Sequence, residues 1–170
     1  MKINFRIIVL IVVLSSITGL LVNYFNPKGV TFIHTERKLQ TAEALSGINL
    51  SSPDPQQINL PQARTLYKQK VVFIDAREED DYNLGHIHNA INIPYSNFET
   101  MKERLTNISK EDVVVTYCGG SDCDLSILLA DKLFADGYKK VLVFFGGWDK
   151  WLTANYPIVI NGELYNAEVE

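Results

Sequence analysis

The stretch Val113-Val114-Val115-Thr116-Tyr117-Cys118-Gly119-Gly120-Ser121-Asp122-Cys123-Asp124 runs from a β-branched apolar segment, through a loop of small residues, to the start of a helix. The run Val113 to Tyr117 predicts a buried strand, and Asp124 is expected to cap a helix that Gly137 ends. Glycine amides in the loop and the positive end of the helix favour a thiolate at Cys118. Because the thiolate is the reactive form of cysteine, the pattern predicts a nucleophile at Cys118.

The segments around this stretch alternate between apolar runs of strand length and helical patterns. Further strands are expected at Val71 to Asp75, Ala90 to Ile93 and Val141 to Phe145, and helices at Pro61 to Lys68, Asn97 to Leu105 and around Trp148 and Trp151. In the helix after Asp124, one face is expected to carry Leu125, Leu128, Leu129 and Leu133. Such apolar strands, separated by helices, predict an α/β fold with a parallel sheet covered on both faces. Ligands of such sheets bind at the carboxyl ends of the strands, where Cys118 lies.

Several short motifs near this loop occur in the order found in the rhodanese domain, so the chain from about Ile58 to Pro157 resembles that family. The motifs are Phe73-Ile74-Asp75-Ala76-Arg77, Tyr82-Asn83-Leu84-Gly85-His86-Ile87, Ala90-Ile91-Asn92-Ile93-Pro94, Tyr117-Cys118, and finally Gly146-Gly147-Trp148 with Trp151 and Tyr156-Pro157. The resemblance implies a rhodanese-like three-layer fold in which Cys118 carries a persulfide during sulfur transfer. It also implies a thiosulfate or persulfide donor, a thiol acceptor or partner protein, and no cofactor.

The loop from Cys118 to Cys123 has a length that suits a cradle around one sulfur and its attached sulfane sulfur. The expected active-site loop consists of Gly119, Gly120, Ser121, Asp122, Cys123 and Asp124, whose backbone amides would stabilise the thiolate and the persulfide. The expected reaction is ping-pong, with a Cys118 persulfide between the donor and acceptor steps. Asp75 and Arg77 follow a buried strand and either line the pocket or form an ion pair. Gly146 and Gly147 are expected to let the backbone pass close to the loop.

Phosphate chemistry on this strand-loop-helix arrangement is disfavoured. A phosphatase or arsenate reductase needs an arginine at the end of the loop for bidentate contact with the oxyanion, whereas this loop ends in Cys123 and Asp124. Asp122 and Asp124 would also repel a phosphate dianion. The same repulsion makes a neutral persulfide or a partner protein a better expected donor than thiosulfate.

Three other interpretations stay open at the level of sequence. Cys123 is near enough along the chain to pair with Cys118 or to resolve its persulfide, as in a thiol redox protein, and it also fits as the last small residue of the loop. The alternative to an enzyme is a non-catalytic rhodanese-like binding or sensing module. His86 and His88 form a weak Cys₂His₂ pattern with the two cysteines, and no metal is expected.

The N-terminal segment from Ile7 to Phe25 contains no charged residue and is long enough to cross about 30 Å of hydrocarbon as a helix. It predicts a single-pass membrane anchor over residues 1–25; a cleaved signal peptide fits less well because no small-x-small site ends the run. Lys2 and Arg6 precede the run, so the positive-inside rule favours the extracytoplasmic side for the domain, although Arg37 and Lys38 after the run reduce the asymmetry of charge. The following Asn26-Pro27-Lys28-Gly29 resembles membrane-anchored, single-domain rhodanese-like proteins of bacteria.

The rest of the chain divides by composition into a Pro- and Gly-containing linker over residues 26–57, the rhodanese-like domain over residues 58–160 and a polar tail over residues 161–170. The net charge of −4, from 16 basic and 20 acidic residues, offers no basic surface, so no nucleic-acid partner is expected. Two cysteines in one loop provide no disulfide framework. The sequence gives no indication of the oligomeric state.

Overall fold

The computed structural model describes residue 6, residues 9–16, residue 18, residues 40–41, residue 50 and residues 52–166. The chain forms two units, Met1–Lys38 and Leu39–Glu170. In the first unit residues 9–16 are helical. Among the described residues, no helix combines the length and the apolar character needed to span a membrane. Parts of the predicted anchor and of the predicted linker lie outside the described residues, so both stay predictions.

A six-stranded sheet forms the centre of the second unit, in the order β1-β2-β7-β6-β3-β5. Every pair of neighbouring strands is parallel, so all carboxyl ends lie at one edge of the sheet. The strands are β1 (Gln40–Thr41), β2 (Gln56–Ile58), β3 (Val72–Asp75), β5 (Ile91–Asn92), β6 (Val113–Tyr117) and β7 (Lys140–Phe144). The predicted parallel sheet is therefore confirmed.

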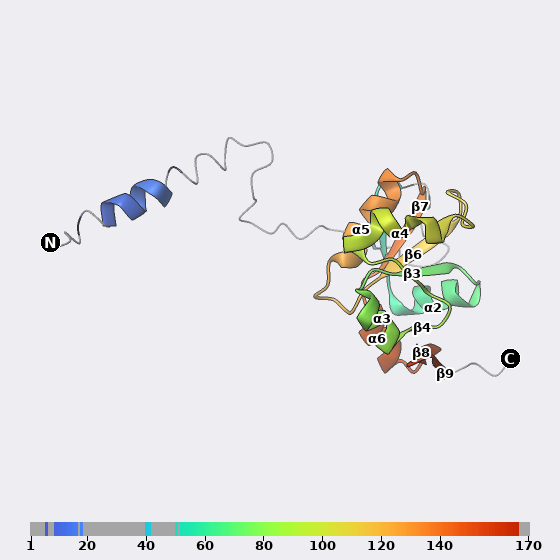
Figure 1. Cartoon of the computed structure of the whole chain (residues 1–170). Helices are drawn as coiled ribbons and strands as arrows, with labels where there is room; N and C mark the ends of the chain where they lie inside the picture. The colour runs from blue at the N-terminus through green and yellow to red at the C-terminus, as the bar shows by residue number, and fades with distance from the viewer. Residues whose placement is uncertain are drawn as a thin grey trace. The chain divides into compact units, whose positions relative to one another are not determined.

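Helices cover both faces of this sheet (Figure 1). One layer contains α4 (Phe98–Met101) and α5 (Leu125–Ala135), and the other contains α2 (Leu60–Lys68) and α6 (Gly147–Thr153). Along β6, Val114 packs into the core cluster on the α5 side, whereas Val115 and Tyr117 pack into the cluster around Trp151. Successive strand side chains point to opposite faces, so a β-branched run is buried on both. The three-layer α/β fold predicted from the sequence is confirmed.

The start of α2 shows how local sequence sets an element. Asn59 caps the helix: its side chain accepts a hydrogen bond from the Gln62 amide at 3.0 Å, and the Gln62 side chain accepts one from the Asn59 amide at 2.8 Å. Pro61 occupies the first turn, where its missing N–H costs nothing. The predicted helix at Pro61 to Lys68 is therefore confirmed with one added residue.

A second, antiparallel sheet was not predicted. It consists of β4 (Gly85–Ile87), β8 (Ile158–Ile160) and β9 (Glu163–Tyr165), and the short helix α3 (Glu79–Leu84) leads into it. Asn161 and Gly162, both at positive φ, form the turn between β8 and β9. The predicted polar tail from residue 161 therefore contains a strand. The sequence did not show it because all three β9 residues are exposed and carry no apolar alternation.

Two other predicted boundaries were inaccurate. Both β1 (Gln40–Thr41) and the start of β2 at Gln56 belong to the sheet, so the domain reaches back into the predicted linker, before the predicted residue 58. The predicted helix from Asn97 to Leu105 is three short pieces, namely the 3₁₀ helix η2 (Tyr95–Asn97), α4 and the 3₁₀ helix η3 (Lys102–Leu105). Boundaries of this kind depend on tertiary packing more than on local pattern.

The helix that follows the cysteine loop differs from its predicted form. Asp124 has helical dihedral angles, φ −84° and ψ −5°, and its side chain makes no capping hydrogen bond to α5. Its carbonyl oxygen accepts the amides of Ile127 and Leu128 instead. Leu128 is 37 % exposed, so the predicted face of four leucines is wrong at this position. The buried face of α5 consists of Ser126, Ile127, Leu129, Ala130 and Leu133.

Candidate active site

Cys118 follows the carboxyl end of β6, the strand between β3 and β7, and is 1 % exposed. Its backbone is fixed by the start of α6. The amide of Trp148 donates to the Cys118 carbonyl oxygen at 2.8 Å, and the amide of Asp149 donates to the Gly119 carbonyl oxygen at 2.8 Å. The predicted position of the cysteine at the strand end is therefore confirmed, and its loop is held by a helix 30 residues further along the chain.

Gly147 makes this approach between α6 and the loop possible. Its φ is +55°, in the left-handed region that glycine adopts without strain. A β-carbon at this position would lie 2.3 Å from the Cys118 carbonyl oxygen and 3.0 Å from that of Gly119. The expected role of the glycine pair, close passage of the backbone, is therefore confirmed for Gly147.

The structure joins Cys118 to Cys123 by a disulfide, with the two α-carbons 6.3 Å apart. Cys123 is half-buried, and its amide donates to the Gly120 carbonyl oxygen at 3.1 Å to form a turn within the loop. Of the two sequence interpretations of Cys123, a pairing partner or an inert small residue, the structure therefore shows the first.

The remaining contacts of the Cys118 sulfur differ from the predicted cradle. Its Sγ lies 2.8 Å from the Cys123 carbonyl oxygen, 4.0 Å from the Gly120 carbonyl oxygen and 3.5 Å from the Ser126 Oγ. Two of these three neighbours are acceptors, whereas the loop was predicted to present amide donors. Stabilisation of a Cys118 thiolate by the amides of residues 119–124 stays a prediction for the reduced state.

Ser126 is a site residue that the sequence reasoning missed. Its side chain is fully buried on the first turn of α5, and its Oγ faces the Cys118 sulfur. Its carbonyl oxygen accepts a hydrogen bond from Thr116 Oγ1 at 2.9 Å, which fixes α5 to β6. A hydroxyl can donate to a thiolate or accept from a thiol. Ser126 is therefore the side-chain donor available to a reduced Cys118.

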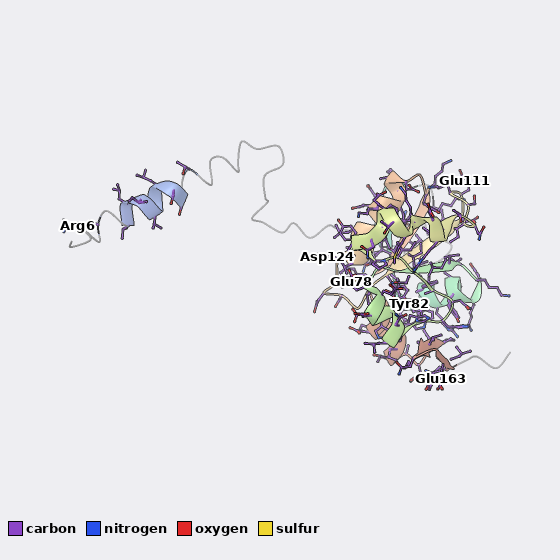
Figure 2. All side chains as sticks on the ribbon, in the orientation of Figure 1. Arg6, Glu78, Tyr82, Glu111, Asp124 and Glu163 are labelled. Carbon is purple, nitrogen blue, oxygen red and sulfur yellow. A yellow bond between two sulfur atoms is a disulfide. The ribbon has the colours of Figure 1, made fainter. Side chains whose placement is uncertain are left out.

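The rim of the loop carries acidic side chains. Ser121, Asp122 and Asp124 are exposed, and Asp124 lies at the surface before α5 (Figure 2). Asp149 approaches Gly120 so closely that a β-carbon there would lie 2.6 Å from its Oδ2. The acidic side chains therefore lie where the sequence placed them, and their repulsion of an anionic donor stays a prediction.

Asp75 and Arg77 form a buried ion pair. Arg77 Nη2 donates to Asp75 Oδ2 at 2.6 Å, and Arg77 Nε donates to Asp75 Oδ1 at 3.0 Å. Burial alone would lower the pKa of Arg77, but the hydrogen bond and charge of Asp75 raise it overall. Nη2 also donates to the Gly85 carbonyl oxygen at 2.7 Å, and the guanidinium lies 5.2 Å from the centroid of the Trp148 ring. Of the two roles proposed from the sequence, the geometry shows the ion pair.

Tyr117, next to Cys118, belongs to the other face of the sheet. Burial and the nearby Asp75 raise the pKa of its phenol well above the ordinary value, so the hydroxyl is neutral. Its oxygen accepts the Ile87 amide at 3.2 Å, which links β6 to β4. Tyr117 therefore has a structural role, because it joins β6 to β4 on the face of the sheet opposite α5.

The two histidines of the weak zinc pattern have other partners. His86 stacks on the Tyr82 ring with centroids 3.8 Å apart, and its Nδ1 lies 2.8 Å from the Tyr82 carbonyl oxygen. Burial lowers the pKa of His86. His88 Nδ1 lies 2.9 Å from the Tyr67 hydroxyl. Across the residues with described positions, no group of three or more histidine, cysteine or acidic side chains forms a metal site.

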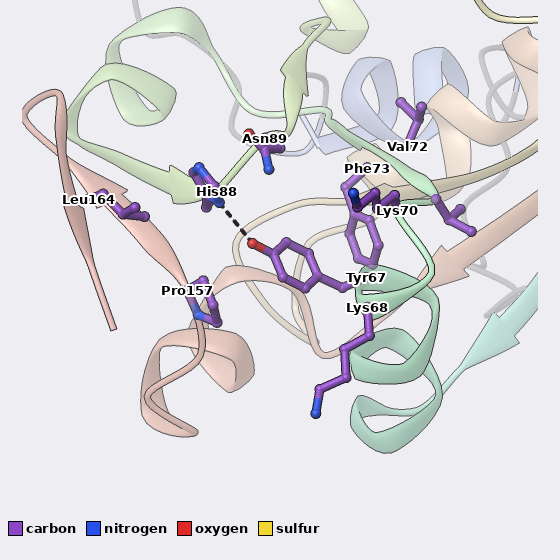
Figure 3. A pocket seen from close by; sticks show the side chains of 10 residues that line it. Tyr67, Lys68, Lys70, Val72, Phe73, His88, Asn89, Pro157 and Leu164 are labelled. Atoms are coloured by element: carbon purple, nitrogen blue, oxygen red, sulfur yellow. Dashed lines mark hydrogen bonds between the residues drawn. The ribbon is translucent and has the colours of Figure 1, made fainter. Parts of the chain in front are cut away.

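A groove of about 570 Å³ lies at the opposite edge of the sheet (Figure 3). It is lined by residues at the start of β3, including Val72 and Phe73, together with Tyr67 and His88. The cysteines follow the carboxyl end of the neighbouring parallel strand. No residue of the cysteine loop lines this groove, so the two are separate.

These features define an α/β domain with a cysteine at the carboxyl end of an inner parallel strand. The rhodanese-like domain family matches this chain over residues 61–154 of its 170 residues. The chain therefore belongs to the rhodanese-like domain family.

Similar proteins agree with this assignment. Thiosulfate sulfurtransferase 18 of Arabidopsis thaliana is 28 % identical over 112 residues, which cover 59 % of this chain and 81 % of the plant protein. The thiosulfate sulfurtransferase GlpE of Coxiella burnetii is 30 % identical over 102 residues, covering 59 % of this chain and 90 % of GlpE. The chain is therefore similar to two proteins that are named thiosulfate sulfurtransferases.

Solved structures share the fold. A Bacillus halodurans protein matches with a TM-score of 0.55 and 25 % identity, over 61 % of this chain and 76 % of its own. The human single-domain sulfurtransferase matches with a TM-score of 0.52 and 21 % identity, over 62 % of this chain and 99 % of its own. At 21 % identity, the match to the human protein shows similarity of fold alone.

Proposed function

We propose that this protein is a sulfurtransferase that moves a sulfane sulfur from a donor to a thiophilic acceptor through a persulfide on Cys118. The observation that carries the proposal is the position of Cys118 at the carboxyl end of β6, directly before the loop and α5. Ligands of parallel sheets bind at this edge. Two relatives that match this chain over 81 % and 90 % of their own length are named thiosulfate sulfurtransferases, and this supports the same chemistry here.

The reaction starts from the reduced pair, because a sulfur held in a disulfide cannot act as a thiolate nucleophile. The Cys118 thiolate attacks the outer sulfur of a donor R–S–SH, so that a bond from Sγ to that sulfur forms and RSH leaves. A thiophilic acceptor then removes the outer sulfur and regenerates the thiolate. The Ser126 hydroxyl, 3.5 Å from Sγ, donates to the sulfur while it is charged.

The acidic rim favours a neutral or singly charged donor. Asp122, Asp124 and Asp149 lie on or beside the loop and are exposed. Exposed charges are screened over about 10 Å at 0.1 M salt, so the repulsion of a dianion is strongest at low ionic strength. We therefore propose a persulfide, small or carried by a partner protein, as a better donor than thiosulfate.

A thiol redox function is the second candidate, because the structure pairs Cys118 with Cys123. It predicts electron exchange with external thiols and no sulfur gained from any donor. The non-catalytic binding module that the sequence leaves open predicts neither turnover nor dependence of its binding on Cys118. Measured turnover with a sulfane sulfur donor therefore separates the sulfurtransferase from the other two, and electron exchange with external thiols separates the redox protein from the binding module.

The test uses the full chain, purified in mild detergent and reduced before the assay. Formation of thiocyanate from cyanide is measured with glutathione persulfide and, separately, with thiosulfate. We expect turnover with the persulfide, less with thiosulfate, and none in Cys118→Ser. Ser121→Ala changes an exposed residue of the same loop and serves as the matched control, which should keep wild-type turnover. Absence of turnover in a folded, reduced wild type would overturn the proposal.

We also propose that the segment from Ile7 to Phe25 anchors the protein in a membrane as a single pass, with the domain on the extracytoplasmic side. The proposal rests on the uncharged apolar run and on Lys2 and Arg6 before it. We expect the chain to stay with membranes in alkaline carbonate and the domain to be degraded by protease added outside intact cells or spheroplasts. Release by carbonate would exclude the anchor, and protection from protease would reverse the topology.

A further inference from the structure

The pairing of the two cysteines bears on how the outer sulfur leaves. Cys118 directly follows β6 and Cys123 lies one residue before Asp124, the N-cap residue of α5, so each lies beside a fixed element of the fold. Their α-carbons are 6.3 Å apart, within the range of about 4.4–6.8 Å that suits a disulfide. The loop between them is held by the Trp148 and Asp149 amides. Cys123 can therefore reach the Cys118 sulfur on the backbone that the structure already has.

We propose that Cys123 is a resolving cysteine that releases the outer sulfur of the Cys118 persulfide as sulfide. This inference rests on the proposed function, because it begins from the persulfide. It gives the Cys118 persulfide a second outcome, release of sulfide, in which a dithiol reductant restores the cysteines and no sulfur acceptor is needed.

The step balances in atoms and electrons. The Cys123 sulfur attacks Cys118 Sγ, so the Cys118–Cys123 disulfide bond forms and the bond from Sγ to the outer sulfur breaks. The outer sulfur leaves as sulfide and takes up the proton of the Cys123 thiol, giving H₂S. The two cysteine sulfurs are oxidised to the disulfide, and the sulfane sulfur is reduced by two electrons to sulfide. The product is the state that the structure shows.

The exposure of the two sulfurs indicates how the disulfide is reduced again. Cys118 is 1 % exposed, whereas Cys123 is half-buried. An incoming thiolate therefore reaches Cys123 first and forms a mixed disulfide there, and Cys118 leaves as a thiolate beside the Ser126 hydroxyl. The second thiol of a dithiol reductant then frees Cys123 and becomes part of its own disulfide. This order returns Cys118 in the form that attacks the next donor.

The test is a single turnover of the reduced full chain at about 10 µM with one equivalent of glutathione persulfide and no other thiol. Free sulfide is measured against time, and the intact mass of the protein is measured at the end. A neighbouring thiol acts at an effective concentration of about 1 mM or more, against about 10 µM of released glutathione, so wild type should release sulfide about a hundredfold faster than Cys123→Ser. The wild-type product should have lost two hydrogens, and Cys123→Ser should hold one added sulfur.

The outcomes separate the inference from the proposed function. If both wild type and Cys123→Ser keep a stable added sulfur and release sulfide at the same slow rate, Cys123 does not resolve the persulfide, while sulfur transfer stands. If neither protein gains sulfur nor releases sulfide, the proposed function fails and the inference fails with it. The wild-type mass needs no variant, so the test remains decisive even if Cys123→Ser does not fold. Addition of dithiothreitol should restore a second turnover in wild type, and failure to do so would contradict the reductant step.

Discussion

Substitution of Gly147 by alanine tests the contact that fixes the cysteine loop. At a φ of +55° an alanine adopts a left-handed conformation, which costs about 1–2 kcal/mol. Its β-carbon would also lie 2.3 Å from the Cys118 carbonyl oxygen, far inside any normal contact. A shift on the order of 1 Å would relieve this overlap and break the two hydrogen bonds from the Trp148 and Asp149 amides. Each bond contributes about 0.5–1.5 kcal/mol, so the total loss of unfolding free energy should be about 2–5 kcal/mol.

The matched control is Gly162→Ala. Gly162 also has a positive φ, +84°, but a β-carbon there meets nothing within 4 Å. We expect a loss of about 1–2 kcal/mol from backbone strain alone and no change in sulfur transfer. Urea unfolding followed by tryptophan fluorescence reports on this domain in the full chain, because both tryptophans of the protein, Trp148 and Trp151, lie in α6. Equal losses of unfolding free energy in the two variants would refute the close-contact argument.

Three further predictions follow from the site. Arg77→Ala leaves the buried carboxylate of Asp75 without its cation and should lower the free energy of unfolding by about 3–5 kcal/mol in urea titrations; a loss below 1 kcal/mol would contradict a buried ion pair. Ser126→Ala removes a hydrogen-bond donor worth about 1 kcal/mol and should slow alkylation of reduced Cys118 about fivefold near neutral pH. Ser121→Ala should leave the alkylation rate unchanged. Equal rates in Ser126→Ala and wild type would show that the Ser126 hydroxyl does not stabilise the thiolate. Burial lowers the pKa of His86 in the folded protein, so the unfolded chain binds more protons as the pH falls below about 6.5, and the free energy of unfolding decreases. His86→Gln should lack this part of the decrease between about pH 7 and 5. An unchanged slope of unfolding free energy against pH would exclude His86 as its source.

The features that the sequence predicted well are those set by local pattern. The run Val113 to Tyr117 consists of four β-branched residues and a tyrosine, and it forms β6 with the same bounds. Because the run is apolar on both faces, the sequence predicts an inner strand of a parallel sheet, which is where β6 lies. The glycines after Cys118 mark the end of the strand. A strand, a loop and a helix in this order suffice to place Cys118 at the carboxyl end of the strand.

The pairing of the cysteines could not be decided in the same way. A disulfide depends on the directions of the two β-carbons, and the loop conformation that sets them is fixed by hydrogen bonds from the distant α6. Sequence proximity shows only that Cys118 and Cys123 are able to meet. The role of Cys123 therefore becomes visible only when α6 and the loop are seen together.

Ser126 was missed for a related reason. The leucines of α5 suggested a buried face that includes Leu128, but in the structure the helix is rotated so that Leu128 is exposed and Ser126 is buried. This orientation is fixed by the hydrogen bond from Thr116 to the Ser126 carbonyl oxygen, between two elements that the sequence reasoning treated separately. A buried serine on the first turn after a reactive cysteine is the signal that would have indicated it.

The measurement that tests the central claim most directly is the intact mass of the reduced full chain carrying Cys123→Ser after exposure to glutathione persulfide. Without Cys123 the outer sulfur cannot leave by pairing of the cysteines, so a persulfide on Cys118 should accumulate. We predict a gain of one sulfur atom, located on Cys118 by peptide mapping, removed by cyanide and absent when Cys118→Ser is added. A folded, reduced protein that gains no sulfur would contradict sulfur transfer through Cys118.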